Sequence, residues 1–485
     1  MKGKAREEEA PSEKGIRKRF VSLLSAQGID GVFSTIFFLY LAWLDSSIYG
    51  AVMYSLAAGM VVMKVVQFGL YYPLVSDLSN ATPEAAPQIL NRVNVIKLGL
   101  CIPCMCAVIA TGFYRGFSHS TTISLVLISV GFSMEALAET FFADFRVRGR
   151  QVAEARIKIA SAVVSYLYGF IAAALGCGLV IISLFKIVSG VVRIVYGLSA
   201  HIKEYSSRWV SAPEWMTVWS VFRAASPFAL IEILGIIYNK TNVFFMESYT
   251  GVNGVAYYSA TFNIIDEISV LASEQFLGWV IFPLLATFWT KDRGRSGRLV
   301  KATGLWLFAF GLPIMFFMYA ESPLIIGLVY PSEYKDAVWM QQYLVWTIVL
   351  SFENNLFAYL MMVAGKVNVL LVFSFMATLA NLVLNIALVP SAGLLGGCLV
   401  IILTKLLMTL LTFYYCRAHF NFVREKEFLF PLVLGAGCFG FFYLIEPVLS
   451  VHPAVLITLG LYLCVLFFFG RQFLGPLPRH VGPSV

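Results

Sequence analysis

Charged side chains occur inside several long apolar stretches of this sequence. An ion at the centre of a membrane costs roughly 2.5 to 3.5 kcal/mol, so such residues face a cavity or an oppositely charged partner. The cations in these stretches are Lys64, Lys97, Lys186, Arg193, Arg223, Lys240 and Lys405. The acids include Asp30, Glu135, Glu139, Glu232, Asp266, Glu267, Glu274 and Glu353. Cations at cavity depth can neutralise a phosphate, and acids can bind a cation or a proton.

Spacing suggests a structural role for some of these charges. Lys186 and Arg193 are seven residues apart and share one helix face, as do Glu135 and Glu139, which are four apart. We expect these two sets to form ion pairs with each other. Two further cations, Lys97 and Arg223, lie near expected helix ends, and snorkelling of their long side chains to the interface accounts for both.

A second group of residues has the chemistry of a cation site. Glu232 lies near the middle of its apolar stretch, and Asn381 and Asn385 present two amide oxygens on one helix face. Thr404 adds a hydroxyl, and one carboxylate with neutral oxygens suits Na⁺. Two alternatives remain open: the asparagines hydrogen-bond neighbouring helices, or Glu232 binds a proton or pairs with Lys405. The coupling ion is therefore Na⁺ or H⁺.

Motifs for nucleotide hydrolysis and common hydrolytic chemistry are absent from the sequence. It contains no GxxxxGK[ST], HExxH or GxSxG motif, and its five histidines lie in loops or at span ends. The cluster of Cys101, Cys104 and Cys106 has no nearby histidine, so we interpret it as packed thiols. We predict no catalytic residue, no organic cofactor and no certain metal site. A membrane glycosyltransferase or polymerase is the alternative from another functional class.

The composition requires a membrane to hold these residues. Of 485 residues, 59% are hydrophobic and 13% are charged, against roughly a quarter charged in soluble domains. The net charge of +8 arises from cations in short gaps between apolar runs, which does not suggest a nucleic-acid partner. Apolar windows of at least about 18 residues predict fourteen transmembrane helices. They lie near 20–44, 48–75, 90–113, 119–143, 153–175, 178–197, 216–246, 253–287, 297–319, 335–363, 367–389, 393–416, 428–447 and 452–471.

The distribution of Lys and Arg supports this count and orients the chain. With a cytoplasmic N-terminus, 26 of the 35 cations fall in inner segments and only Arg115 and Lys335 fall in outer loops. Cytoplasmic loops carry such an excess of Lys and Arg. We therefore predict both termini in the cytoplasm.

Weak internal similarity divides the chain into two halves. Gly50, Tyr54 and Ser55 recur 204 residues later as Gly254, Tyr258 and Ser259. An even number of helices separates the copies, so both halves have the same orientation. The predicted organisation is an all-α membrane protein with a cytoplasmic tail over 1–19, an N-lobe over 20–200 and a C-lobe over 201–416. Two additional spans and a short cytoplasmic tail occupy 417–485.

The sequence resembles the polysaccharide transporter branch of the multidrug, oligosaccharidyl-lipid and polysaccharide exporter superfamily, which includes O-antigen flippases. The resemblance rests on two short motifs. One is the basic inner loop Phe142 to Arg148, and the other is the run of Asn381, Asn385, Leu388, Pro390, Gly393, Gly396 and Gly397. The resemblance implies two six-helix lobes that form a V around a central cavity, which opens alternately to each side. Related members hold a cation among the same helices of the second lobe.

The resemblance also implies a substrate and its contacts. Spans two and seven line the cavity in the family, which makes Lys64 and Lys240 the candidate substrate-binding cations. The alternative is that each pairs with an acid, such as Asp266 or Glu267 for Lys64. The implied function is translocation of a lipid-linked oligosaccharide of the polyprenyl-pyrophosphate type across the bacterial cytoplasmic membrane. Its implied partners are membrane lipid and other polysaccharide assembly proteins. A cation-coupled multidrug antiporter of the same fold is the alternative.

Overall fold

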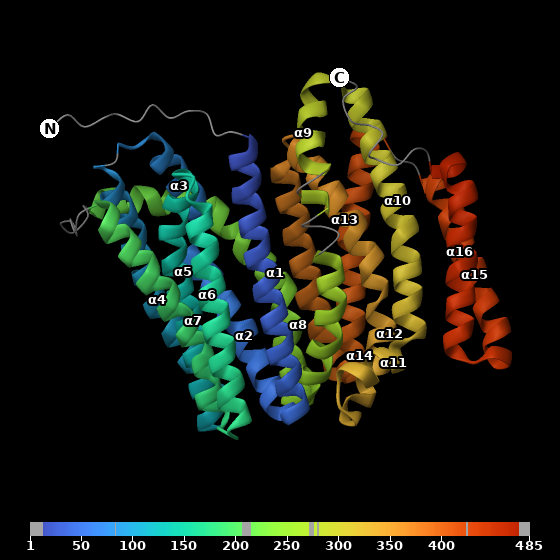
Figure 1. Cartoon of the computed structure of the whole chain (residues 1–485), viewed down its shortest axis with the longest axis horizontal. Coiled ribbons are helices and arrows are strands. Elements are labelled where there is room, and N and C mark those ends of the chain that lie inside the picture. The colour runs from blue at the N-terminus through green and yellow to red at the C-terminus, as the bar shows by residue number, and fades with distance from the viewer. Residues whose placement is uncertain are drawn as a thin grey trace. The chain divides into compact units, whose positions relative to one another are not determined.

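A computed structural model describes residues 13–82, 84–205, 215–270, 276–278, 281–422 and 425–474 (Figure 1). All regular secondary structure in these ranges is helical. The chain divides into two compact units, residues 1–240 and 241–485. The expected all-α membrane class is confirmed.

The first unit is built around one central helix. Its elements are α1 (Glu13–Leu44), α2 (Ser46–Gln67), α3 (Tyr71–Asn80), α4 (Ala86–Tyr114), α5 (His119–Val147), α6 (Gln151–Ala174), α7 (Leu179–Tyr205) and the first part of α8 (Trp215–Val270). Helix α5 packs against α2, α3, α4, α6 and α7. Gly131 and Gly190 allow α5 and α7 to approach closely, because a Cβ at Gly131 would lie 2.5 Å from the carbonyl oxygen of Lys186.

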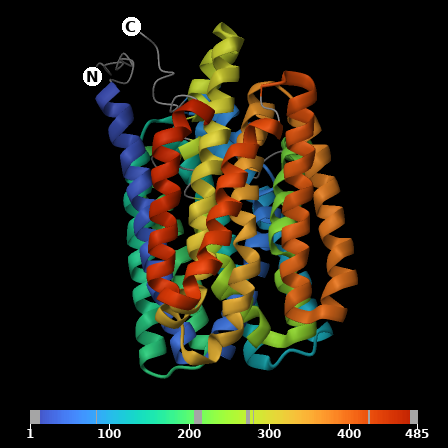
Figure 2. The same cartoon turned by 90° about the vertical axis from the view of Figure 1, so that its right-hand side faces the viewer.

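The second unit begins within α8 and ends with a helical hairpin. It contains the rest of α8, α9 (Phe282–Lys291), α10 (Arg293–Ala320), α11 (Ser322–Val329), η2 (Ser332–Tyr334), α12 (Lys335–Leu344), α13 (Trp346–Val363), α14 (Val367–Phe420), η3 (Glu425–Phe428), α15 (Leu429–Leu449) and α16 (Val451–Leu474). Figure 2 shows the hairpin of α15 and α16 in red, and these helices pack against each other and against α10.

Eleven helices in the described part of the chain are long and apolar enough to cross a membrane, or twelve when the bent pair Ser332–Leu344 and Trp346–Val363 is counted as one span. This count does not confirm the fourteen expected spans. Two of the eleven run for 42 and 54 residues, although about 20 residues cross a bilayer. Each is broken at a glycine with positive φ, at Gly251 (φ 71°) and Gly393 (φ 54°).

These two breaks lie beside each other within the second unit. A Cβ at Gly393 would lie 3.6 Å from Cγ2 of Thr250, and one at Gly254 would lie 3.2 Å from Cδ2 of Leu394. If the chain crosses the membrane on each side of both breaks, the total is the fourteen spans that hydropathy predicts. The count of fourteen therefore stays a prediction.

The expectation that 48–75 forms one continuous span is wrong. Helix α2 ends at Gln67, and Phe68 (φ 45°) and Gly69 (φ 59°) are left-handed before α3 begins at Tyr71. Gly69 is required here, since a Cβ would lie 2.4 Å from the backbone nitrogen of Ala229 on α8. Hydropathy could not detect this break because the residues on both sides are apolar.

The corresponding span of the second half lies partly outside the described residues. The window 253–287 was expected to be one helix. Helix α8 is described as far as Val270, residues 276–278 and 281 are π-helical, and α9 covers Phe282–Lys291. A continuous span over 253–287 therefore stays a prediction.

Candidate functional site

A polar cavity of about 220 Å³ lies within the first unit. Its lining comes from α2, the break after it, α3, α4, α5 and α8. The lining residues are Lys64, Gln67, Gly69, Tyr71, Leu74, Lys97, Glu139, Arg146 and Glu232. Three cations and two acids give the lining a formal excess of one positive charge.

Lys64 lies in the last turn of α2 and lines the cavity. The backbone N–H of Phe68 donates to the carbonyl of Lys64 and closes the last turn of α2. The Lys64 ammonium lies 3.2 Å from Oε2 of Glu232 on α8. The two side chains are 33% and 19% exposed, so this ion pair remains open to water. The structure therefore gives Lys64 a carboxylate partner, Glu232, within its own unit.

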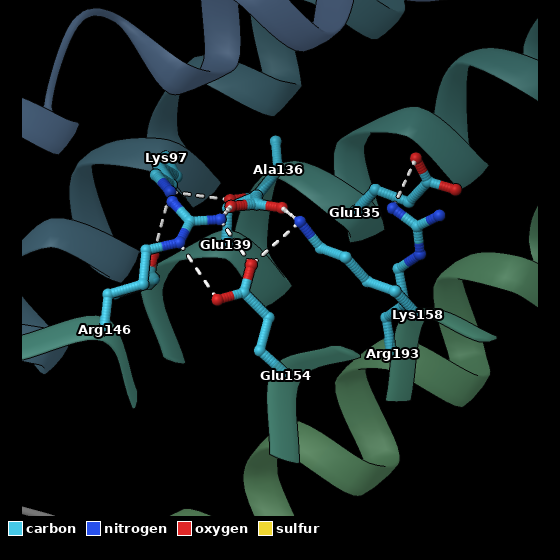
Figure 3. A network of polar contacts seen from close by, with 9 residues as sticks. Lys97, Glu135, Ala136, Glu139, Arg146, Glu154, Lys158 and Arg193 are labelled. Atoms are coloured by element: carbon cyan, nitrogen blue, oxygen red, sulfur yellow. Dashed lines mark hydrogen bonds and ion pairs between the residues drawn. The ribbon is translucent and has the colours of Figure 1, made fainter. Parts of the chain in front are cut away.

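Lys97 is the most deeply buried cation of the cavity. The residue is 4% exposed, and Nζ donates to the carbonyl oxygen of Ala136 at 2.6 Å and to Oγ1 of Thr140 at 2.8 Å. Figure 3 shows it reaching toward α5. Within the described residues no acid lies at ion-pairing distance from Lys97. The snorkelling interpretation of Lys97 is thus wrong, because packing against α5 holds the ammonium inside the unit.

Arg146 anchors one wall of the cavity in a balanced ion network. Its Nη2 lies 3.0 Å from Oε2 of Glu139, and its Nε donates to Oε2 of Glu154 at 3.0 Å. Lys158 completes the network with contacts of 3.0 Å to Glu139 and 2.9 Å to Glu154. Figure 3 shows these four side chains meeting between α5 and α6. Two cations and two acids compensate one another here, so Glu139 and Arg146 are held in place.

A separate buried cluster confirms one of the expected pairings. Glu135 on α5 lies 2.8 Å from Nζ of Lys186 and 3.3 Å from Nη1 of Arg193, and it accepts a 2.6 Å hydrogen bond from Ser189. The pairing of Lys186 and Arg193 with Glu135 is therefore confirmed. Their expected pairing with Glu139 is wrong, because Glu139 lies one turn further along α5 and pairs with Arg146 and Lys158.

Asn381, Asn385 and Thr404 come together in the second unit. Asn242 of α8, which the sequence analysis did not select, is the centre of this cluster. Its Oδ1 accepts from Asn385 at 2.9 Å and from Asn381 at 3.3 Å, and Asn381 also donates to Thr404 at 3.3 Å. All four residues are buried, and Oδ1 of Asn385 has no hydrogen-bond partner among the described residues. The asparagines thus hydrogen-bond a neighbouring helix, which the sequence left open as the alternative to a cation site.

The remaining candidates have other surroundings. Glu232 belongs to the first unit, where Lys64 neutralises it. Lys405, considered above as its partner, instead lies 3.8 Å from Asp266 and donates to Ser351 at 2.9 Å. Lys240 is half-buried on α8 and is not among the residues that line the cavity. Lys97 and Arg146 were missed as cavity residues because sequence position alone does not reveal which way they point.

Three comparisons place the chain among known proteins. Residues 44–339 match the family described as "Polysaccharide biosynthesis protein". An uncharacterized membrane protein of Methanocaldococcus jannaschii is 23% identical over 230 residues, which are 47% of this chain and 44% of that protein. The match thus spans less than half the length of this relative.

Solved structures share the fold at low sequence identity. The lipid II flippase MurJ in an inward closed conformation superimposes with a TM-score of 0.71 and 13% identity, over 93% of this chain and 98% of its own. An inward-facing multidrug resistance MATE family transporter of the MOP superfamily gives 0.61 and 14%, over 81% and 94%. A MOP superfamily transporter from Pyrococcus furiosus gives 0.54 and 13%, over 85% and 96%. Since the family match covers more than half of the 485 residues, this chain belongs to the polysaccharide biosynthesis protein family, and its fold is that of the MOP superfamily.

Proposed function

We propose that this chain translocates a lipid-linked oligosaccharide of the polyprenyl-pyrophosphate type across the cytoplasmic membrane by alternating access. Membership of a polysaccharide biosynthesis family supports the glycan class, and the fold shared with a lipid II flippase supports movement of a lipid-linked substrate. The flipped product then enters surface polysaccharide assembly. The observation that carries the proposal is the cationic cavity of the first unit.

The cavity suits a pyrophosphate group because its cations differ in availability. Glu139 and Glu154 form ion pairs with Arg146, whereas the hydrogen bonds of Lys97 within the described residues go to neutral oxygens. Lys64 is partly exposed and pairs with the carboxylate of Glu232. An incoming phosphate can replace this carboxylate as the partner of the Lys64 ammonium. Charge-assisted hydrogen bonds to phosphate are roughly twice as strong as neutral ones. We infer that the pyrophosphate binds between Lys64 and Lys97, and Lys240 remains a proposed further contact.

We also propose that a cation gradient drives the cycle. In the second unit, Oδ1 of Asn385 is a buried oxygen that the amide cluster leaves without a donor. The other oxygens of that cluster accept hydrogen bonds from Asn381 and Asn385. A Na⁺ ion bound there would use Asn385 with Asn242, Asn381 and Thr404 as neutral ligands. Glu232, already neutralised by Lys64, is the weaker candidate for a Na⁺ ligand.

Binding of a defined probe tests the anion site. Farnesyl pyrophosphate should raise the Tm of the purified full-length protein, and farnesol should not. Lys64→Ala should lose most of this shift, whereas Lys366→Ala removes a lysine exposed between α13 and α14 and should keep it. Equal shifts with both probes would refute recognition of the pyrophosphate.

Translocation separates the flippase from the antiporter. Proteoliposomes containing the protein should move a fluorescent polyprenyl-pyrophosphate oligosaccharide between leaflets. They should not accumulate ethidium in response to a cation gradient. The reverse result would assign the chain to the cation-coupled multidrug antiporters and overturn the proposal.

A further inference from the structure

The carboxyl group of Glu353 on α13 is buried without a hydrogen-bond partner. The residue is 5% exposed, and neither Oε1 nor Oε2 meets a donor among the described residues. It points toward α10, where a Cβ at Gly304 would lie 3.4 Å from Oε2. The carboxyl therefore lies close to the backbone of α10 at Gly304.

The charged groups around α13 do not compensate Glu353. Helix α13 packs against α9, α10, α12 and α14. Lys405 of α14 contacts Ser351 and Asp266, and Lys301 of α10 pairs with Glu427. The other charged or titratable His, Lys, Arg and Asp residues on these helices are Lys291, Arg293, Arg295, Arg298, Lys335, Asp336, Arg417 and His419. In the part of the chain that the structure describes, none of these cations is paired with Glu353, and Glu274 lies outside that part.

Glu135 in the first unit shows what a charged buried glutamate requires. It is as deeply buried as Glu353, but Lys186, Arg193 and Ser189 surround its oxygens. Glu353 has none of these partners. A buried carboxylate without a partner is so unfavourable that the group takes up a proton and becomes neutral instead.

We propose that Glu353 is a proton-binding site that couples a proton to the transport cycle, an inference that rests on the proposed cation-driven mechanism. With α10 and α13 closed, the carboxyl holds its proton. When these helices separate and water reaches Glu353, the proton passes to water and the carboxylate remains. The helices cannot close over the charge until a proton returns. Proton occupancy and helix position are thereby linked, as coupled transport requires.

The buried hydroxyl of Thr303 adds a second observation at α10. Thr303 precedes Gly304, and its Oγ1 also lacks a hydrogen-bond partner among the described residues. Unsatisfied polar groups are rare in a stable packed interface, because each one costs free energy. Thr303 and Glu353 thus place two such groups on the neighbouring helices α10 and α13.

Infrared spectroscopy of the full-length protein tests the protonation state directly. At neutral pH the wild type should show the carbonyl stretch of a protonated carboxylic acid, and Glu353→Gln should lack that component. Asp336→Asn removes an exposed acid from neighbouring α12 and should leave the band unchanged. A band identical in wild type and Glu353→Gln would overturn the assignment.

A transport measurement tests the coupling separately. In proteoliposomes, a pH gradient should stimulate wild-type translocation several-fold and should not stimulate Glu353→Gln, which should retain gradient-independent exchange. Glu353→Asp, which can still bind a proton, should retain part of the stimulation and guards against a variant that merely misfolds. Equal stimulation of wild type and Glu353→Gln would refute the coupling role. Absence of any wild-type translocation would instead refute the proposed function, and the infrared result would still stand.

Discussion

The ammonium of Lys64 and the carboxylate of Glu232 form a 3.2 Å ion pair that joins the last turn of α2 to α8. The pair lies in the cavity wall, next to the break at Phe68 and Gly69. Because both side chains are partly exposed, the pair contributes little stability. Its position instead makes Glu232 a competitor of any anion that binds Lys64.

Opposite effects on anion binding should follow when the two partners are changed separately. Lys64→Gln should weaken binding of farnesyl pyrophosphate by about ten- to a hundredfold, since a hydrogen bond to a charged group contributes roughly 1.5 to 3 kcal/mol. Glu232→Gln should strengthen it by releasing Lys64. Titration of both purified variants measures the two dissociation constants. A change in the same direction for both would show that they do not compete.

Na⁺ should stabilise the protein through the amide cluster of the second unit. The Tm should rise with NaCl more than with choline chloride at equal ionic strength, because only Na⁺ can be bound by the amide oxygens. Asn385→Ala should remove this difference. Glu232→Gln should keep it if Glu232 is not a ligand. No difference between the two salts in the wild type would exclude the Na⁺ site.

The N-cap of α2 should make stability depend on acid pH. Asp45 accepts hydrogen bonds from the backbone N–H groups of Ser47 at 2.7 Å and Ile48 at 3.2 Å. Partial burial opposes the shift, but these bonds and the Ser47 hydroxyl lower the pKa of Asp45 from 3.8. The stabilising contribution is therefore complete above that value and is lost as the pH falls through the lower pKa of the folded state.

Two substitutions separate the cap from its charge. Asp45→Ala should lower the free energy of unfolding by about 1 kcal/mol near neutral pH. Asp45→Asn should retain most of the cap, since asparagine caps helices as well as aspartate, but should lose this part of the acid dependence. The Tm of the wild type, Asp45→Ala and Asp45→Asn, each measured against pH, tests both expectations. Parallel curves for wild type and Asp45→Asn would contradict the role of the carboxylate.

The break after α2 should not tolerate any side chain at Gly69. Gly69→Ala would place a Cβ 2.4 Å from the backbone of Ala229 and would force alanine into the left-handed φ of 59° that Gly69 adopts. The free energy of unfolding should therefore fall by at least about 1 to 3 kcal/mol. Gly28→Ala is the matched control, because no atom lies within 4 Å of its Cβ position in α1. It should be neutral or raise stability by roughly 0.5 to 1 kcal/mol. Similar losses for both variants would show that the close approach at Gly69 is not decisive.

Reporter fusions should place two junctions on the same side of the membrane. The excess of Lys and Arg in the inner segments predicts a cytoplasmic position after Lys203 and at Asp292, between α9 and α10. A reporter that is active only in the cytoplasm should work at both positions. Periplasmic activity at either one would refute the parallel orientation of the two halves.

The sequence alone predicted the membrane class, the approximate helix positions and one ion-pair cluster. Hydropathy and helical spacing are local properties, and they identified the spans and the shared faces of Glu135, Lys186 and Arg193. The family motif similarly pointed to Asn381 and Asn385. These features depend on residues that are close in the sequence or on a side-chain chemistry that has few alternatives.

Only the tertiary structure decided which charges remain available to a ligand. Lys64 and Glu232 are 168 residues apart, and nothing in their own helices indicates that they meet. Lys97 has the same local signal as a snorkelling lysine, yet α5 buries it. Glu353 differs from Glu135 only in what the neighbouring helices offer it. A charge inside a membrane is compensated by partners on other helices, and the packing of the helices determines which residues those partners are.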